Sequence, residues 1–320
     1  MGITPGQAPF RILSLSGGGF LGLYTAVVLQ LLEERAGVPL ARRFDLLAGT
    51  SIGGVLALGL AYEIPMRRMV DLFVEHGSAV FSDRALPSGA VSRLMDLTRS
   101  VLGPKYSGDA LRKALRSEIH DRTLDRAKHA VVITAVDVND CRTKVFKTPH
   151  TATSRGDGTL RAVDVAMAAC AAPAYFPSVR IGERLFADGG LYAVAPDQVA
   201  LHEAQQFIGV DPDGVHMLSI GTAVHRYHPR DAVREDAGAV GWLGEGRLIL
   251  TLLSAQQQHV QAMMEDRLRE RYLRLDADWP PDSGLGIDVA TPEAIELLTR
   301  LAHQTLASTS EKQLGRFLAP

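Results

Sequence analysis

Cysteine, long apolar runs and an excess of one charge are all missing from this sequence, and each absence narrows the class of protein. Its 320 residues include two cysteines, Cys141 and Cys170. Two cysteines are too few for a disulfide framework, so we expect a reducing, cytoplasmic compartment. No apolar run approaches the ~18 residues that a membrane-spanning helix needs. The first residues lack the basic and apolar regions of a signal peptide, so we expect contact with a membrane only at its surface.

The charges are nearly balanced, with a net charge of −2, and 46% of the residues are hydrophobic. This composition is typical of an ordinary globular protein. It provides no general attraction to a nucleic-acid polymer or to anionic lipid, so such contacts need a local patch. Neither cysteine has a partner at metal-ligand spacing, and we predict no metal site.

Apolar runs of two kinds alternate along the chain. Strand-like runs occupy 11–16, 44–49, 130–138 and 215–221, a further one at 184–187 leads into Asp188, and helical patterns occupy 23–36, 52–61, 161–170, 197–206 and 245–271. Continuous apolar strands that alternate with amphipathic helices are typical of a parallel sheet covered on both faces. We therefore predict one three-layer α/β domain over residues 1–320, with a mostly parallel central sheet and helices on both faces.

Two stretches extend this core with helices. Residues 62–128 contain no convincing strand and read as a helical insertion over an edge or mouth of the sheet. They hold 12 Lys and Arg against 9 Asp and Glu, in contrast to the negative charge of the whole chain. Residues 245–320 read as a C-terminal helical elaboration, in which Thr291-Pro292-Glu293 is a helix-start signal.

Two glycine motifs follow the first two strands. The first, "SGGGFLG", contains Gly17, Gly18, Gly19 and Gly22, and the second, "GTSIGG", contains Gly49, Ser51 and Gly53. The first motif alone also fits a dinucleotide-binding loop, but the acidic residue that should end the next strand is missing, since Asp45 begins it. The second motif is a nucleophile elbow, a sharp strand-to-helix turn that presents a serine hydroxyl.

The two motifs together favour acyl transfer over phosphate binding. Attack by Ser51 on an ester carbonyl would create an oxyanion, which backbone N–H groups can stabilise. We expect these groups to come from Gly17, Gly18 and Gly19 and from Ile52, which follows the nucleophile.

The proton acceptor for Ser51 has two candidates in the sequence. One is a histidine, of which the chain has ten, in a Ser-His-Asp triad. The other is Asp188, whose two following residues, Gly189 and Gly190, allow a sharp turn beside the carboxylate. The residues themselves leave this choice open, along with a third reading as a non-catalytic nucleotide-binding protein.

The motifs "SGGGFLG", "GTSIGG", "AAPAYFP" and "DGG", in this order, resemble the patatin-like phospholipases over residues 10–222. The resemblance implies a Ser51–Asp188 dyad without histidine, an oxyanion hole from the glycine loop, and hydrolysis of phospholipid acyl esters without a cofactor. Two positions depart from the family pattern: Leu21 replaces a basic residue, and Val194-Ala195 replace an Asn-containing turn.

A narrower resemblance concerns "KYSGDALRKAL", "VFKTPH" and "HMLSIGT", which are similar to bacterial antiphage phospholipases switched on by a cyclic oligonucleotide. It implies a cyclic dinucleotide activator, contact with membrane phospholipid in the active state, and a role in antiviral defence. The basic helical insertion is the expected site of the activator, with Arg67, Arg68 and Arg84 as candidate phosphate ligands. Association with further copies of the chain is left open.

Overall fold

The described part of the chain is organised around one sheet. A computed structural model describes residues 8–83, 103–152, 154–224, 235–236, 238, 241–242, 247–278 and 283–319. Within them, eight strands form a single sheet in the order β5-β6-β3-β2-β1-β7-β8, with β4 paired to β3. The strands are β1 (Phe10–Leu15), β2 (Leu46–Thr50), β3 (Val131–Asp137), β4 (Arg142–Lys147), β5 (Val179–Ile181), β6 (Arg184–Asp188), β7 (Val215–Ile220) and β8 (Tyr272–Leu275).

The central strands are parallel and those at one side are antiparallel. β3, β2, β1, β7 and β8 pair in parallel, whereas β4 and β6 run antiparallel to β3, and β5 runs antiparallel to β6. The predicted α/β class with a mostly parallel sheet is confirmed. Three strands, β4, β5 and β8, were not predicted. β4 carries an exposed Arg and two half-buried Lys side chains, and β5 and β8 are too short to show an apolar run.

Helices cover both faces of the sheet. They are α1 (Gly22–Ala36), α2 (Ile52–Ala61), α3 (Met66–Val80), α5 (Asp109–Ile119), α6 (Ala162–Ala169), α7 (Asp197–His202), α9 (Arg247–Leu268), α10 (Pro292–Ser308) and α11 (Glu311–Leu318). Side chains of α1, α2, α3, α5, α6, α10 and α11 join one large apolar cluster, those of α7 join a second, and α9 contributes side chains to both. Alternate residues of β1 divide between the two clusters, Leu13 into the first and Ile12 into the second, because successive side chains of a strand point to opposite faces.

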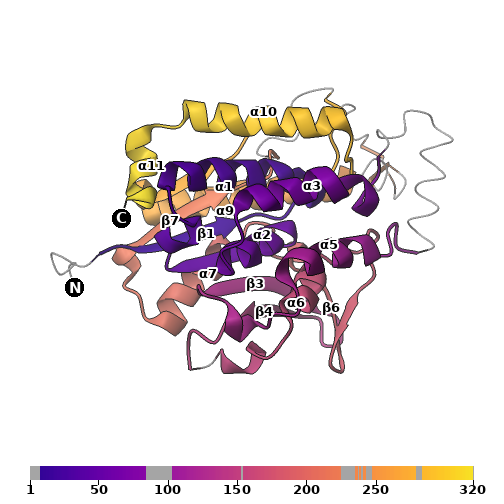
Figure 1. Ribbon diagram of the computed structural model, residues 1–320, viewed down its shortest axis with the longest axis horizontal. Helices are drawn as coiled ribbons and strands as arrows, with labels where there is room; N and C mark the ends of the chain where they lie inside the picture. The colour runs from indigo at the N-terminus through magenta and orange to yellow at the C-terminus, as the bar shows by residue number, and fades with distance from the viewer. Residues whose placement is uncertain are drawn as a thin grey trace.

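The C-terminal helices add an outer layer to one face. α10 packs along α1 and lies outside it (Figure 1). The Tyr24 hydroxyl of α1 donates a hydrogen bond to Thr305 of α10 at 2.8 Å. Thr291 caps α10 by accepting from the Ala294 N–H, as its sequence signal indicates. The described residues form two helices after this signal, α10 and α11.

Residues 66–80 and 109–119, within the stretch predicted as a helical insertion, form α3 and α5. These two helices pack against each other, and α5 also packs against α6. The domain limits of 62–128 and 245–320 remain predictions. Among the described residues, none of the helices combines the length and apolar character that crossing a membrane requires.

One edge of β3 brings two distant segments together. β4 occupies the other edge along nearly the whole of β3. β2 pairs with the first half of β3 as far as Thr50 opposite Thr134, and β6 pairs with the second half, with Asp188 opposite Ala135. Because β2 and β6 run toward each other along this shared edge, the end of each strand meets the end of the other. The residue after Thr50 is Ser51.

Candidate active site

Ser51 is the single residue that connects the end of β2 to the start of α2. Its backbone has φ 53° and ψ −127°, a conformation that residues other than glycine rarely adopt. The turn is sharp because α2 starts directly against the sheet. A Cβ atom on Gly49 would lie 2.3 Å from the carbonyl oxygen of Gly53, and one on Gly53 would lie 2.3 Å from that of Leu15. Both glycines of the elbow motif are therefore required by close backbone contact.

Asp188 accepts a hydrogen bond from the Ser51 hydroxyl. Ser51 Oγ donates to Asp188 Oδ2 at 2.6 Å, and the Gly190 N–H donates to Oδ1 at 2.7 Å. The carboxyl is 5% exposed, and this burial raises its pKa to about 6, although the two hydrogen bonds act in the opposite direction. At neutral pH the carboxylate is ionised and holds a hydrogen bond to the serine, the arrangement of a general base.

Gly189 permits this close approach. A Cβ atom there would lie 2.2 Å from Thr134 Oγ1 of β3. The turn after β6 therefore passes directly over β3, next to the end of β2, and any larger residue would push Asp188 away from Ser51. Thr134 is itself fixed by a 2.7 Å hydrogen bond to Thr50.

Cys170 is a third side chain beside Ser51 and Asp188, although in the sequence it reads only as a small residue in an apolar stretch. It is 6% exposed. Burial and the nearby negative charge of Asp188 raise the pKa of its thiol, and a hydrogen bond with Ser51 acts in the opposite direction. The thiol is thus a neutral neighbour of the pair formed by Ser51 and Asp188.

The glycine loop lies against the elbow. A Cβ atom on Gly17 would be 3.1 Å from Ser51 Cβ, and one on Gly22 would be 2.7 Å from Ile52 Cγ2. The N–H of Gly17 donates to the carbonyl of Val194 at 2.9 Å. Gly17 is therefore not free to donate to an oxyanion, contrary to expectation, and its role is to let the loop approach the serine.

Three other backbone N–H groups of the predicted oxyanion hole remain available. Within the described ranges, the amides of Gly18, Gly19 and Ile52 have no hydrogen-bond partner. Gly19 has φ 60° and its Cβ position would lie 2.2 Å from the Ile287 carbonyl oxygen, so no other residue fits there. A Cβ atom on Gly18 would lie 2.4 Å from Thr222 Oγ1. Leu21, which departs from the family pattern, is fully buried in the core.

An apolar pocket begins beside Ser51. Its walls come from α2, α3 and α5, and it is lined by Ile52, Val55, Met69, Leu72, Phe73, His76, Gly77, Val80, Phe81, Leu111, Ala114 and Leu115. Ile52, the residue after the serine, is one of its lining residues. The pocket has a cavity volume of about 40 Å³ and is partly open to solvent. The sequence did not reveal this pocket, because its lining residues read as ordinary core positions of three separate helices.

The histidines considered for a triad lie elsewhere or cannot be placed. His202 stacks edge-on against Phe207. His216 pairs with Arg11, at the opposite end of β1 from the glycine loop, and burial lowers its pKa. His225 lies outside the described residues. The hydroxyl of Ser51 donates to Asp188 and to no histidine of the described chain.

The candidate phosphate ligands of the predicted helical insertion lie in different surroundings. In the parts of the chain described above, no three His, Cys, Asp or Glu side chains are grouped as a metal site. Arg68 is engaged with Glu118 at 2.7 Å, a contact that joins α3 to α5. Arg67 is exposed, and Arg84 lies outside the described residues.

Comparison of the sequence with known proteins shows which family the chain resembles. The family model for patatin-like phospholipases matches residues 13–201. A "cGAMP-activated phospholipase" of Pseudomonas aeruginosa is 40% identical over 278 residues, which are 87% of this chain and 81% of that protein. Proteins with the same name from Vibrio cholerae and Escherichia coli are 32% and 30% identical, and each match covers 97% of this chain and 93% of the relative.

Proposed function

Because this chain belongs to the patatin-like phospholipases and is an acyl ester hydrolase, we propose that Ser51 and Asp188 are its catalytic dyad and cleave membrane phospholipids. The observation that carries the proposal is the 2.6 Å hydrogen bond from Ser51 Oγ to Asp188 Oδ2, made by a strained serine and a buried carboxylate. Strained backbone that the surrounding structure maintains is common at active sites. The contact supports a direct transfer of the serine proton to aspartate.

The reaction follows from this contact. Asp188 takes the proton of Ser51 as Oγ attacks the ester carbonyl, and a tetrahedral oxyanion forms. The free amides of Gly18, Gly19 and Ile52 are the donors for this oxyanion, and each such donor is worth about 3–4 kcal/mol. When the intermediate collapses, Asp188 returns the proton to the leaving lysolipid. Water, activated by the same carboxylate, then releases the fatty acid from the acyl-serine.

The pocket between α2, α3 and α5 is the proposed site of the acyl chain. Its lining is almost entirely apolar, and Ile52 connects it to the nucleophile. Burial of each methylene contributes about 0.8 kcal/mol, so a pocket of this kind holds the acyl group while Ser51 attacks its carbonyl. On this view the predicted helical insertion contributes the acyl-binding wall through α3 and α5.

Regulation by a cyclic dinucleotide is the finer part of the proposal. It rests on the names of the three relatives and on the basic character of residues 62–128. The activator must bind the active form more tightly than the resting form, and a hundredfold shift in the equilibrium requires about 2.7 kcal/mol. The biological role that fits is messenger-triggered degradation of the membrane during phage infection, by a cytoplasmic protein that contacts lipid when active.

Hydrolysis of a fluorogenic phospholipid, with and without cGAMP, tests the proposal. Ser51→Ala and Asp188→Asn should each abolish release of fatty acid, while His202→Ala, on a ring that packs against Phe207, should retain activity. Mass spectrometry should detect lysolipid and free fatty acid. Diacylglycerol or phosphatidic acid as first product, or full activity of Asp188→Asn, would contradict the proposed chemistry. Activity that is independent of the nucleotide would contradict the regulation alone.

A further inference from the structure

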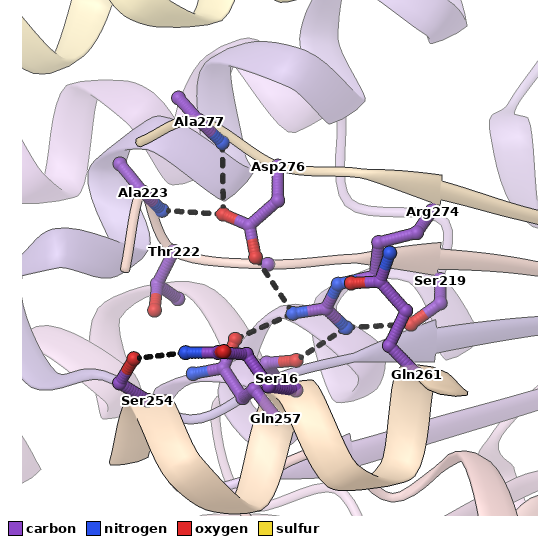
Figure 2. A network of polar contacts seen from close by, with 12 residues as sticks. Ser16, Ser219, Thr222, Ala223, Ser254, Gln257, Gln261, Arg274, Asp276 and Ala277 are labelled. Atoms are coloured by element: carbon purple, nitrogen blue, oxygen red, sulfur yellow. Dashed lines mark hydrogen bonds and ion pairs between the residues drawn. The ribbon is translucent and has the colours of Figure 1, made fainter. Parts of the chain in front are cut away.

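A buried arginine lies behind the glycine loop. Arg274 of β8 has a side chain that is 4% exposed, and its guanidinium has partners on four elements of the fold (Figure 2). Nη1 donates to Ser16 Oγ at 3.0 Å and to Ser219 Oγ at 2.8 Å. Nη2 donates to Asp276 Oδ2 at 2.8 Å and to Gln257 Oε1. One cation thus ties together the ends of β1, β7 and β8 and the helix α9.

Two of these contacts lead directly to the glycine loop. Ser16 is the residue before Gly17. Asp276, the partner of Arg274, accepts the N–H of Ala223 at 2.9 Å, which fixes the turn after β7. In that turn Thr222 Oγ1 donates to the carbonyl of Gly17 at 3.2 Å. The loop is therefore held on both sides of Gly17 by groups that depend on the same ion pair.

A third contact leads to the segment that follows Asp188. Ser219, which Arg274 contacts, donates to Asp197 Oδ1 at 2.9 Å. Asp197 is fully buried and begins α7, shortly after the aspartate of the proposed dyad. The guanidinium therefore connects the glycine loop to the segment that carries the general base.

The fourth contact leads to α9. Gln257 is 2% exposed and reaches Arg274 from this helix, and the adjacent Gln256 accepts the N–H of Val194 at 3.3 Å. Val194 in turn accepts the N–H of Gly17. Two chains of hydrogen bonds thus join α9 to the glycine loop. One runs from Gln257 through the Arg274 side chain, and the other runs from Gln256 through the backbone of Val194.

The hydrogen-bond network around Arg274 includes features that lower the stability of the folded state. Arg274 Nε and Gln257 Nε2 are buried and have no partner among the described residues. Buried donors of this kind are uncommon and destabilise the folded state, and a buried ion pair can often be replaced by apolar side chains without loss of stability. A folding role alone would be served better by an apolar contact between α9 and the sheet.

We propose that Arg274 is a positioning residue for acyl transfer: through Ser16, Asp276 and Gln257 it sets the position of the glycine loop relative to Ser51 and makes that position depend on α9. The inference rests on the proposed function of Ser51 and Asp188, because the loop matters only where an oxyanion forms. A small misplacement of such donors can reduce the rate by up to about 100-fold.

Kinetics of three variants test this role. Ser16→Ala removes the hydroxyl before the loop, Gln257→Met removes the tie to α9, and Arg274→Lys keeps the positive charge beside Asp276 but cannot make four contacts at once. For each we expect kcat on a fluorogenic phospholipid to fall about tenfold or more, with KM within about twofold. Phosphonylation of Ser51 by an alkyl fluorophosphonate, measured with cGAMP present, should slow in parallel. Because one network carries these effects, Ser16→Ala should add little to Arg274→Lys.

Gln258→Met is the matched control, since Gln258 neighbours Gln257 on α9 but is exposed and bonds only to Ser254 among the described residues. It should behave as the wild type. The inference is overturned if the three variants keep wild-type kcat and phosphonylation rates below their unfolding temperatures, if Gln258→Met loses as much, or if the losses of Ser16→Ala and Arg274→Lys multiply. A wild-type protein that neither hydrolyses lipid nor reacts with the fluorophosphonate would instead refute the proposed function.

Discussion

Replacement of Asp188 by asparagine should stabilise the folded protein while it abolishes hydrolysis. The carboxylate of Asp188 is buried, and burial raises its pKa from the ordinary value of 3.8 to about 6. A rise of this size corresponds to about 3 kcal/mol of unfavourable free energy for holding the ionised form in the folded state. Asparagine has nearly the same shape and no charge, so it avoids this cost while its carbonyl can still accept the Gly190 N–H.

The stability that Asp188→Asn gains over the wild type should increase with pH. Well below the ordinary pKa of 3.8 the carboxyl is neutral in the folded and the unfolded chain, and the wild type carries no penalty. Between about pH 4 and pH 6 the unfolded carboxyl ionises while the folded one stays protonated, so the wild type progressively loses stability, by about 3 kcal/mol in total once the folded carboxyl has ionised too. The advantage of Asp188→Asn should therefore grow between pH 4 and pH 7 and stay constant above that range.

Differential scanning calorimetry of both proteins between pH 4 and pH 8 measures this difference. The entropy of unfolding scales with chain length, so 3 kcal/mol in a chain of 320 residues corresponds to about 4 °C in Tm. The reasoning is refuted if Asp188→Asn melts at or below the wild-type temperature at pH 7.5, or if the difference in Tm between the two proteins does not change with pH. Asp45→Asn, at the start of β2, is a control outside the proposed site.

Further measurements follow from the same site. The kcat/KM of the wild type should fall about tenfold per pH unit below about pH 6, as the pH profile of a base with the raised pKa of Asp188 requires; a flat profile down to pH 5 would assign the base elsewhere. Ala114→Leu should reduce kcat/KM for palmitoyl esters about tenfold relative to butyryl esters, because two methylenes or more of the chain lose their place in the pocket; equal losses for both esters would contradict the assignment of the pocket. Iodoacetamide should alkylate exposed Cys141 in the native protein and Cys170 only after unfolding, as peptide mass spectrometry can determine; equal rates would place Cys170 at the surface.

The predicted fold rests on local signals that tertiary structure did not override. The parallel strands β1, β2, β3 and β7 are buried on both faces, so each appears in the sequence as a continuous apolar run. The glycine motifs were visible for a similar reason. Close backbone contacts at Gly49 and Gly53 exclude every larger side chain, which leaves a sequence pattern that a reader can find without a structure.

Other features of the candidate site depend on contacts between distant segments, and no local pattern records them. The N–H of Gly17 was expected to face an oxyanion, but it bonds to Val194, a residue of a different loop. Cys170 reads as core because only its place beside Asp188 gives it a chemical neighbour. Arg274 sits in a strand of four residues, and its partners come from four separate elements. The catalytic roles of Ser51 and Asp188 remain predictions, now supported by a 2.6 Å hydrogen bond between the two side chains.

The head-on meeting of β2 and β6 along one edge of β3 has a consequence for biosynthesis. Ser51 and Asp188 are 137 residues apart in the chain. At about 5–20 residues per second, a ribosome needs roughly 7 to 30 s to add the second after the first. During that interval the nascent chain holds a serine without its base, and the strand that carries Arg274 is made later still. A nascent chain that ends before Asp188 therefore has no assembled dyad, and on the proposed mechanism it cannot hydrolyse lipid.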